Sequence, residues 1–573
     1  SQKLNRFKQT TCFKPLHFTI QQAKATYATN RMKVGPNFTS SHNVNEKEQL
    51  YVLDLILNKG KSVFITGPAG TGKTTLLKTV IFELRKLYPP IKLYGATRKQ
   101  VLVTATTGTA ALNIGGTTYH KALGLRNLYS PEKMILRQIL RTRSKNDWKT
   151  CKVLIIDEIS MMSAGTLDLL DRLAKTIRSN DSPFGGIQVV LSGDFFQLPP
   201  VSKTSVKKVL KSYEAKEEKM NFDLVKTHKG IDHRSENGMA FKSRIWNTGI
   251  DNSVALSKIY RQSEDKTFAN VLNQLRVGKL SYKSKDVFDK IAMESRRRVM
   301  APFGTKLFGT RKEADRYNNK VTLQLPTKPV TYFSGKGGVL KDSPHFKTIN
   351  DSMSNRERLT LKRGSYVMVT ANLNKNLLNG TTGTVVGFKR KIFEQTRSQH
   401  SRLYNQKKPK FWKEPSEVHF DIQDVPSWKF PKNSGLRKQQ GSVKNDLMPL
   451  IEFCNHNTQR KTTTPITPQS SVLKTSKLST VLQWSAQLPL INAWGLTIHK
   501  AQGKTYLNLS VDLKNIFAEG QIYVALSRAR DRKGIHISNW KHWKSRSSKE
   551  VLEFYNSRVE KFDKYGNLVK KKQ

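Results

Sequence analysis

The sequence has few acidic residues for its length. Its 573 residues include 43 Asp and Glu against 100 Lys and Arg, which gives a formal net charge of +57 and a pI near 10.2. A chain this basic repels itself unless a polyanion neutralises it, so the charge indicates nucleic acid as the partner. A Lys-rich composition that reflects genome bias is the alternative explanation. A membrane surface is less favoured because no strong amphipathic anchor is visible.

Cysteines and long apolar runs are also scarce. The three cysteines, Cys12, Cys151 and Cys454, lie far apart and form no pair with metal-ligand spacing. This argues against a disulfide scaffold or a cysteine metal site and predicts a reducing intracellular compartment. No run of about 18 apolar residues occurs, so we expect no membrane span. The apolar fraction of 37% still suffices for more than one core.

The two ends of the chain are basic. The first 44 residues contain seven Lys and Arg and no acidic residue. We predict a flexible basic tail over 1–44, with an organelle transit sequence as the alternative. The chain begins with Ser rather than Met, which indicates a fragment or a processed form. A basic C-terminal extension is predicted over 541–573.

From residue 46 onward, helical patterns alternate with short apolar runs. Apolar residues recur at helical spacing over 46–60, 74–88 and 166–179. Short apolar runs typical of buried strands occupy 62–66, 101–106, 153–157 and 187–194. This alternation predicts an α/β fold with a parallel sheet covered on both faces. We expect the first domain to span 45–250.

A second α/β pattern is interrupted by a different kind of sequence. It begins near residue 255 and returns near the C-terminus, which predicts a second domain over 251–360 and 481–540. Between these halves, 361–389 reads as antiparallel strands with a turn at Asn379–Gly380. Residues 389–480 carry 18 Lys and Arg against 7 Asp and Glu and are rich in polar residues. We expect an inserted β-rich subdomain over 361–480 with a partly disordered loop.

The strongest motif is GPAGTGKT at 67–74, which matches the phosphate-binding loop pattern in full. Its glycines let backbone amides approach phosphates, Lys73 adds positive charge, and the Thr74 hydroxyl can ligate Mg²⁺. An ordinary Gly-rich turn is the alternative, which the flanking strand and helix disfavour. The motif predicts an ATP site with Mg²⁺ built from Gly67, Pro68, Ala69, Gly70, Thr71, Gly72, Lys73, Thr74 and Thr75.

Two further motifs place residues of types common in catalysis at the ends of predicted strands. In LIIDEIS (154–160), Asp157 would hold Mg²⁺ and Glu158 would orient or deprotonate the attacking water. In SGDFFQLPPV (192–201), Gln197 can bond both that water and a γ-phosphate. Solvated acids at a strand end and a structural glutamine are the alternatives.

Phosphoryl transfer also needs positive charge at the γ-phosphate, which an arginine finger supplies. Arg261 in KIYRQ and Arg528 in YVALSRAR are the two candidates. Both follow the first predicted sheet, so we expect both on the second domain, where they would couple hydrolysis to closure of a cleft. With 100 basic residues in the chain, a structural role is the alternative for each.

The ordered motifs resemble those of superfamily 1 helicases, and within them the petite-integration-frequency family of eukaryotic 5′→3′ DNA helicases, especially its fungal members. The resemblance runs from about residue 45 to about residue 540. Besides the motifs above it includes VTATTGTAALNIGGTTYH, LPLINAWGLTIHKAQGKT and the family-like signature LDLLDRLAKTIRSNDSPFGGIQ. It implies two RecA-like P-loop motor domains, with a small β-barrel insertion that contains 361–389.

The resemblance also implies roles for individual residues. Gln49 falls where the family reads adenine, and Gln502 and Gly503 join the nucleotide site. Tyr260 departs from the Phe that is common at its position. Thr hydroxyls and amides suit phosphate contacts that read no bases, whereas for each histidine a structural role is the alternative. The DNA-binding candidates are Thr106, Thr107, Gly108, Asn113, Thr117, His120, Thr497 and His499.

Together these motifs predict an ATP-dependent DNA helicase that uses ATP and Mg²⁺. Its 5′→3′ direction is implied by the resemblance alone. So are roles in DNA repair and recombination, telomere maintenance and G-quadruplex unwinding, and a location in the nucleus or mitochondrion. We expect single-stranded, duplex and quadruplex DNA as partners of a protein that is monomeric in solution and dimeric on DNA.

Three alternatives remain open. The first is a nucleic-acid-stimulated ATPase that remodels protein or RNA without unwinding DNA. The second is a DNA-binding scaffold with an inert motor, against which the six intact catalytic candidates argue. The third is a transposon-borne helicase, although the chain shows no His-hydrophobic-His nuclease motif.

Overall fold

The computed structural model describes most of the chain between residues 43 and 569. The gaps lie at 94, 126–127, 129–131, 201–237, 263, 298–303, 338–356, 372, 375–376, 378, 391–416, 420–446, 455–460, 475–480, 542–546 and 564–566. The predicted basic tail up to residue 42, much of the predicted loop within 389–480 and the terminal lysines lie outside the described residues. None of the described helices is long and apolar enough to cross a membrane.

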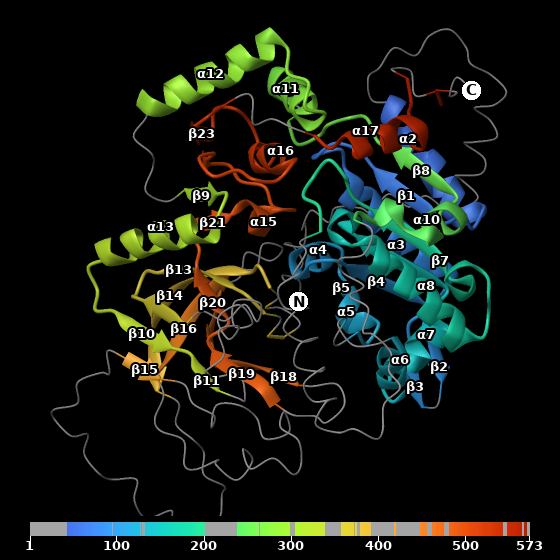
Figure 1. The fold of residues 1–573 in the computed structure, drawn as a ribbon, viewed down its shortest axis with the longest axis horizontal. Coiled ribbons are helices and arrows are strands. Elements are labelled where there is room, and N and C mark those ends of the chain that lie inside the picture. The colour runs from blue at the N-terminus through green and yellow to red at the C-terminus, as the bar shows by residue number, and fades with distance from the viewer. Residues whose placement is uncertain are drawn as a thin grey trace, which may run out of the picture.

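Six parallel strands form the first sheet, in the order β5-β4-β6-β7-β1-β8 (Figure 1). The four strands predicted in this region are confirmed to within two residues. The six are β1 (Val63–Thr66), β4 (Val101–Ala105), β5 (Thr117–Thr118), β6 (Val153–Asp157), β7 (Gln188–Ser192) and β8 (Asn252–Ala255).

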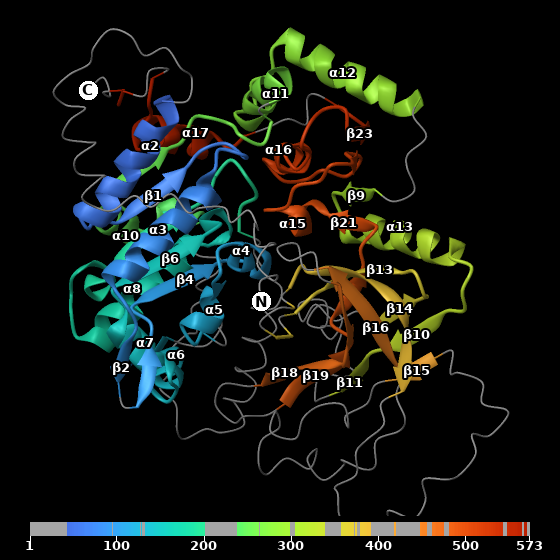
Figure 2. The ribbon, with the colours of Figure 1, turned by 180° about the vertical axis from the view of Figure 1, so that it is seen from behind.

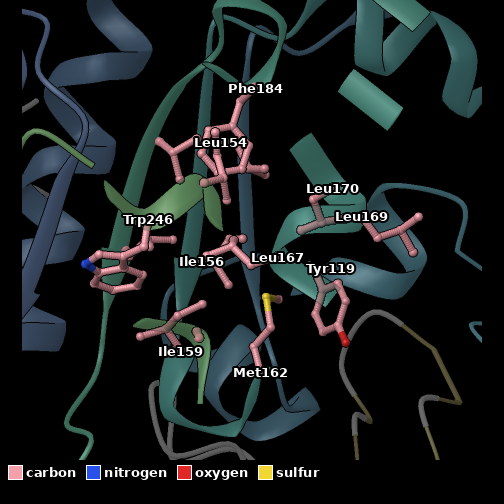
Figure 3. Close-up of a cluster of buried hydrophobic side chains, with 14 of the residues drawn as sticks. Tyr119, Leu154, Ile156, Ile159, Met162, Leu167, Leu169, Leu170, Phe184 and Trp246 are labelled. Atoms are coloured by element: carbon pink, nitrogen blue, oxygen red, sulfur yellow. The ribbon is translucent and has the colours of Figure 1, made fainter. Parts of the chain in front are cut away.

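Strands β1, β4, β6 and β7 are buried on both faces because each face of the sheet has its own core. Val63, Ile65 and their neighbours contact α2 (Asn43–Leu53) and α3 (Lys73–Leu87). Phe64 and Leu154 belong to the core on the other face, which also contains residues of α8 (Ala164–Arg178) and α10 (Arg244–Gly249). Figure 3 shows Leu154 in this core, with Leu167 of α8 and Trp246 of α10. The predicted helix at 46–60 is α2 continued by a π-helical turn over 54–58. Smaller elements are β2 (Ile91–Leu93), β3 (Ala96–Arg98), α4 (Gly108–Asn113), α5 (Tyr119–Ala122), α6 (Glu132–Leu140) and α7 (Ser144–Thr150).

The C-terminal helix α17 (Lys549–Ser557) returns to the first sheet. Phe554 and Tyr555 lie in the same core as Phe64, and Glu560 bridges to Val254 in β8. Figures 1 and 2 both show α17 beside α2, and Figure 1 shows β8 next to them. The predicted extension 541–573 thus contains a partly buried helix, and the predicted boundary at 250 falls just before the last strand of the first sheet.

A second, four-stranded parallel sheet has the order β21-β9-β22-β23. Because β9 lies between β21 and β22, the two separate halves predicted for the second domain meet in one sheet. The strands are β9 (Thr305–Phe308), β21 (Gly495–Thr497), β22 (Leu509–Asp512) and β23 (Ile535–Ser538). The helices are α11 (Lys266–Arg276), α12 (Tyr282–Arg297), α13 (Arg311–Gln324), α15 (Ile498–Ala501) and α16 (Gln521–Leu526).

The inserted subdomain is built on an antiparallel sheet in the order β17-β16-β14-β13-β20. The predicted hairpin is confirmed as β13 (Tyr366–Val369) and β14 (Thr382–Arg390). The other strands are β16 (Leu447–Cys454), β17 (Lys461–Pro465) and β20 (Leu490–Asn492). Two three-stranded sheets flank it: β12 (Arg358–Leu361), β10 (Val330–Phe333) and β15 (Glu417–His419); and β11 (Gly335–Gly337), β19 (Val481–Gln487) and β18 (Gln469–Lys474).

The insertion differs from its prediction in extent and content. It begins at β10 and ends at β20, so it is wider than 361–480. Four of its strands, β15, β16, β17 and β18, lie where a loop-rich segment was expected. The side chains of β17 are mostly exposed, and its sequence KTTTP is therefore polar enough to resemble a loop.

Candidate functional site

The loop between β1 and α3 requires glycine at several positions. Gly67, Gly70 and Gly72 have φ of 136°, 88° and 79°, a region that side chains rarely adopt. A Cβ on Gly67 would also overlap the carbonyl oxygen of Leu256, and one on Gly70 would lie 2.7 Å from the Cβ of Arg261. The loop is thus shaped by its glycines and leads into the N-terminus of α3 at Lys73, where backbone amides favour an anion.

A cavity of about 550 Å³ opens above this loop. Its wall includes thirteen of the residues predicted for nucleotide binding and catalysis. They are Gln49, Ala69, Gly70, Thr71, Gly72, Lys73, Thr74, Thr75, Glu158, Gln197, Arg261, Gly503 and Arg528. Four others stand behind the wall: Gly67, Pro68, Asp157 and Gln502. Residues spread over more than 450 positions of the sequence therefore meet in one cavity.

Lys73 and Glu158 line the cavity, and Asp157 is close enough for its charge to act on Lys73. The Lys73 ammonium donates to the carbonyls of Gly67 at 2.7 Å and Pro68 at 2.8 Å, and burial lowers its pKa to about 8. Burial, with the charge of Glu158, raises the pKa of Asp157 to about 7. A nearby cation would favour the ionised form of Asp157, as expected for a metal-binding carboxylate.

The donor set near the loop fits a hard cation. The Asp157 carboxylate and the Thr74 hydroxyl supply oxygen, the ligand type that Mg²⁺ prefers. Within the described residues no group of three or more His, Cys, Asp or Glu side chains could hold a metal. Mg²⁺ commonly uses one or two protein ligands together with substrate phosphates, so two oxygen donors match that mode.

Two arginines also line the cavity. Arg528 is 2% exposed, and its Nε donates to the carbonyl of Val524 at 3.0 Å. Arg261 donates to the carbonyl of Ser527 at 3.0 Å. Burial lowers the pKa of both guanidinium groups, that of Arg261 to about 10 with a contribution from the charge of Arg528. Two repelling buried cations at one cavity favour an anion between them.

The two glutamines lie beside the acids. Gln502 donates from Nε2 to the Glu158 carboxylate at 3.1 Å. Gln197 is 5% exposed, and its Oε1 is buried without a hydrogen-bond donor in the described structure. Gln197 lines the cavity, and an amide oxygen that lacks a donor is suited to accept a hydrogen bond from a water molecule.

The sequence predicted both arginines on the second domain, and this prediction is wrong for Arg261. Arg261 follows β8, which pairs with β1, so it stays on the first domain and lies against Gly70. Arg528 follows α16 in the second domain, as predicted. The cavity therefore receives one arginine from each side.

The predicted DNA-binding residues fall into two groups. Thr106 donates to the carbonyl of Glu158 at 2.8 Å, Thr107 caps the N-terminus of α4, and Gly108 is buried. These three are engaged within the protein. Asn113 and Thr117 are exposed, and His120, Thr497 and His499 are half-buried. A role in DNA contact stays a prediction for all eight.

His499 forms the base of a possible stacking surface. Its ring lies 6.1 Å from that of Phe517 at an interplanar angle of 16°, and Phe517 is 71% exposed. Burial lowers the pKa of His499, so the imidazole is neutral at pH 7. A neutral ring behind an exposed aromatic side chain suits base stacking better than phosphate binding.

Known proteins resemble this chain in sequence and fold. A family model for PIF1-like helicases matches residues 44–227. The ATP-dependent DNA helicase RRM3 of Saccharomyces cerevisiae is 31% identical over 90% of this chain and 68% of its own length. The crystal structure of Pif1 helicase from Candida albicans superposes with a TM-score of 0.67 at 31% identity, covering 91% of this chain and 98% of that one. The chain belongs to the PIF1-like helicase family.

Membership confirms the predicted family and the two-motor α/β fold. The ATP-dependent DNA helicase PIF1 of Candida albicans is 34% identical over 89% of this chain. The chain spans 56%, 66% and 61% of the curated PIF1 proteins of Candida albicans, Emericella nidulans and Saccharomyces cerevisiae. The Bacteroides Pif1 bound to single-stranded DNA shares the fold, with a TM-score of 0.60 at 23% identity.

Sequence reasoning missed several residues around the site of this PIF1-like chain. Tyr260, noted only as a departure, lines the cavity. Tyr523 accepts a hydrogen bond from the Ala69 amide at 2.7 Å, and Asp194 lies fully buried behind the loop. Asp194 and Tyr523 stand inside GDFFQLPPV and GQIYVALSRAR, so their motifs could have drawn attention to them. Nothing in the sequence pointed to Tyr555.

Proposed function

We propose that this chain is an ATP-dependent DNA helicase that moves 5′→3′ along single-stranded DNA and unwinds duplex or structured DNA. The observation that carries the proposal is the cavity between the two motor domains, in which Glu158, Gln197 and Arg261 from one side meet Arg528 from the other. The relatives named ATP-dependent DNA helicase support the same activity. The direction rests on the family alone.

The residues of the cavity divide the work of phosphoryl transfer. Lys73 and the loop amides bind the phosphates, and Gln49 borders the adenine end. Glu158 accepts a proton from water that Gln197 orients, while Arg261 and Arg528 stabilise the charge that develops. Thr74 and Asp157 would hold Mg²⁺, which neutralises phosphate charge when bound. Since Arg528 comes from the second domain, hydrolysis is coupled to closure of the two domains.

DNA is proposed to lie across the motors, near Asn113, Thr117 and His499. Quadruplex DNA as a substrate, a monomer that pairs on DNA, and action in the nucleus or mitochondrion belong to the same proposal. They rest on the resemblance to the family and on the charge of +57.

Strand displacement on tailed duplexes tests the proposal. ATP is added to two partial duplexes of equal length, one with a 5′ and one with a 3′ single-stranded tail, and strand release is measured. Release from the 5′-tailed duplex alone is expected, and Glu158→Gln serves as the inactive control. Release from the 3′ tail alone would keep the helicase and overturn its direction. DNA-stimulated ATP hydrolysis without release from either would favour a translocase or remodeller.

A further inference from the structure

A buried polar cluster lies behind the phosphate loop, centred on Asp194. The Arg276 guanidinium donates to its carboxylate from Nε at 3.0 Å and Nη2 at 2.8 Å, and the Tyr555 hydroxyl donates at 3.2 Å. The Tyr523 hydroxyl lies 3.5 Å away. Burial alone would raise the pKa of Asp194, but the charge and hydrogen bonds of Arg276, together with the charge of Lys73 and the Phe196 amide, outweigh burial and hold the pKa below its usual range. The carboxylate is therefore ionised and fully paired.

The cluster joins three separate parts of the molecule. Asp194 follows β7 of the first domain, whereas Arg276 ends α11 and Tyr523 lies in α16 of the second domain. Tyr555 comes from α17 near the C-terminus. Because Ala69 donates to Tyr523, the second domain also reaches the phosphate loop itself through this cluster.

Tyr555 connects the cluster to the two strand ends that carry the site. Its hydroxyl lies 2.5 Å from Oγ1 of Thr66, the last residue before the phosphate loop. It also accepts the amide of Phe195 at 3.2 Å, two residues before Gln197. One buried hydroxyl thus holds both the approach to the phosphate loop and the segment that carries Gln197.

The same C-terminal segment supports the opposite end of the cavity. The Glu560 carboxylate accepts hydrogen bonds from Tyr51 at 3.0 Å and from Asn252 at 2.8 Å. Tyr51 is two residues from Gln49, which lines the cavity. The segment 549–560 therefore braces both ends of the nucleotide site without lining it.

We propose that Tyr555 is a positioning residue for ATP hydrolysis, an inference that rests on the proposed function. Its hydroxyl fixes Thr66 and Phe195 relative to Asp194, so that the phosphate loop and Gln197 keep their alignment with the arginine that the second domain supplies. Tyr555 does not touch the cavity and acts only through these neighbours.

The test compares Tyr555→Phe with Tyr332→Phe in the full chain. Tyr332 is equally buried but lies in β10 of the inserted subdomain, so both changes remove one buried hydroxyl. We expect kcat for ATP hydrolysis with single-stranded DNA to fall about five- to tenfold in Tyr555→Phe only. The KM for ATP is expected to change less than about twofold, since ground-state contacts remain.

A double-mutant cycle separates positioning from packing. If Tyr555 and Arg276 act through the same carboxylate, Tyr555→Phe combined with Arg276→Lys costs little more in kcat than the larger single change. Multiplied losses would overturn the inference, as would a Tyr555→Phe enzyme equal to Tyr332→Phe. Wild-type protein that hydrolyses no ATP would overturn the proposed function and this inference together.

Discussion

The Lys73 ammonium lies against the carbonyls of its own loop, at the point where a phosphate would enter. Removing it by Lys73→Ala should reduce ATP turnover by about 100-fold or more, since Lys73 is the only charged residue of the sequence GPAGTGKT and its charge would stabilise the phosphates. Affinity for single-stranded DNA at low salt should change less than about threefold, because 100 − 1 = 99 basic residues remain. Turnover and fluorescence anisotropy measure the two effects. Lys78→Ala, exposed on the same helix, is the control. Retained turnover in Lys73→Ala would contradict the nucleotide-site assignment.

Lys504 provides a pH-dependent test of burial. Its ammonium donates to the carbonyl of Gly380 at 2.8 Å, and burial lowers its pKa to about 8 from an ordinary 10.5. Between these values the unfolded chain binds more protons than the folded one, so folded stability rises with pH in this window. Lys504→Met removes that rise. The stability of the variant relative to wild type should therefore fall by about 2–3 kcal/mol from pH 7 to pH 10.5. Thermal unfolding across this range measures it, and a constant difference would refute the prediction.

At the scale of residues, the sequence predicted the cavity-lining residues that lie inside recognisable motifs. Lys73, Glu158, Gln197 and Arg528 lie where their motifs placed them. Partners brought together by folding could not be predicted, because Arg276 and Tyr555 are 82 and 361 positions from Asp194. Residue type also does not reveal which side chains are hydrogen-bonded within the protein, as Thr106 is.

At the scale of elements, the apolar content of a segment decided whether its helix or strand could be predicted from the sequence. Strands β1, β4, β6 and β7 of the first sheet are buried on both faces, and their continuous apolar runs were found to within two residues. The exposed strand β17 and the short strand β8, with sequence NSVA, carry weaker patterns. Helix α17 has an apolar face, but it lies in a basic region whose composition masked it.

The turn of the β13–β14 hairpin joins the inserted subdomain to both motors. Thr109 after β4 donates to the carbonyl of Asn379 at 3.0 Å, and Lys504 of the second motor donates to that of Gly380. Gly380 has φ of 97°, and a Cβ there would overlap the Thr109 hydroxyl. Gly380→Ala should therefore destabilise the docked turn by about 1–3 kcal/mol.

Hydrogen exchange of the β13–β14 hairpin measures this loss directly. Gly387→Ala is the matched control, because it lies in β14 with nothing within 4 Å of its added Cβ. Faster exchange in Gly380→Ala alone is expected. Equal exchange in both variants would show that the turn is not held against Thr109.

At the scale of the whole molecule, positive charge exceeds what a nucleotide site needs. One ATP and its Mg²⁺ cannot balance a net charge of +57, whereas a DNA strand adds one negative charge per nucleotide. In the proposed function, ATP bound in the shared cavity would move the two motors relative to one another. The excess charge would keep the protein on a strand during that movement, because phosphate contacts carry no sequence information.

Counterion release predicts how strongly the affinity for single-stranded DNA depends on salt. Each phosphate neutralised on a single strand contributes about −0.7 to the slope of log K against log salt, so six contacts would lower the affinity roughly 300-fold between 50 and 200 mM. We expect a loss of this order in anisotropy titrations with single-stranded DNA. The KM for ATP over the same range is the internal control, and it should change far less, since the groups that bind ATP are buried and poorly screened. If the basic composition were genome bias spread evenly over the surface, few charges would face the strand, and the slope would be shallow.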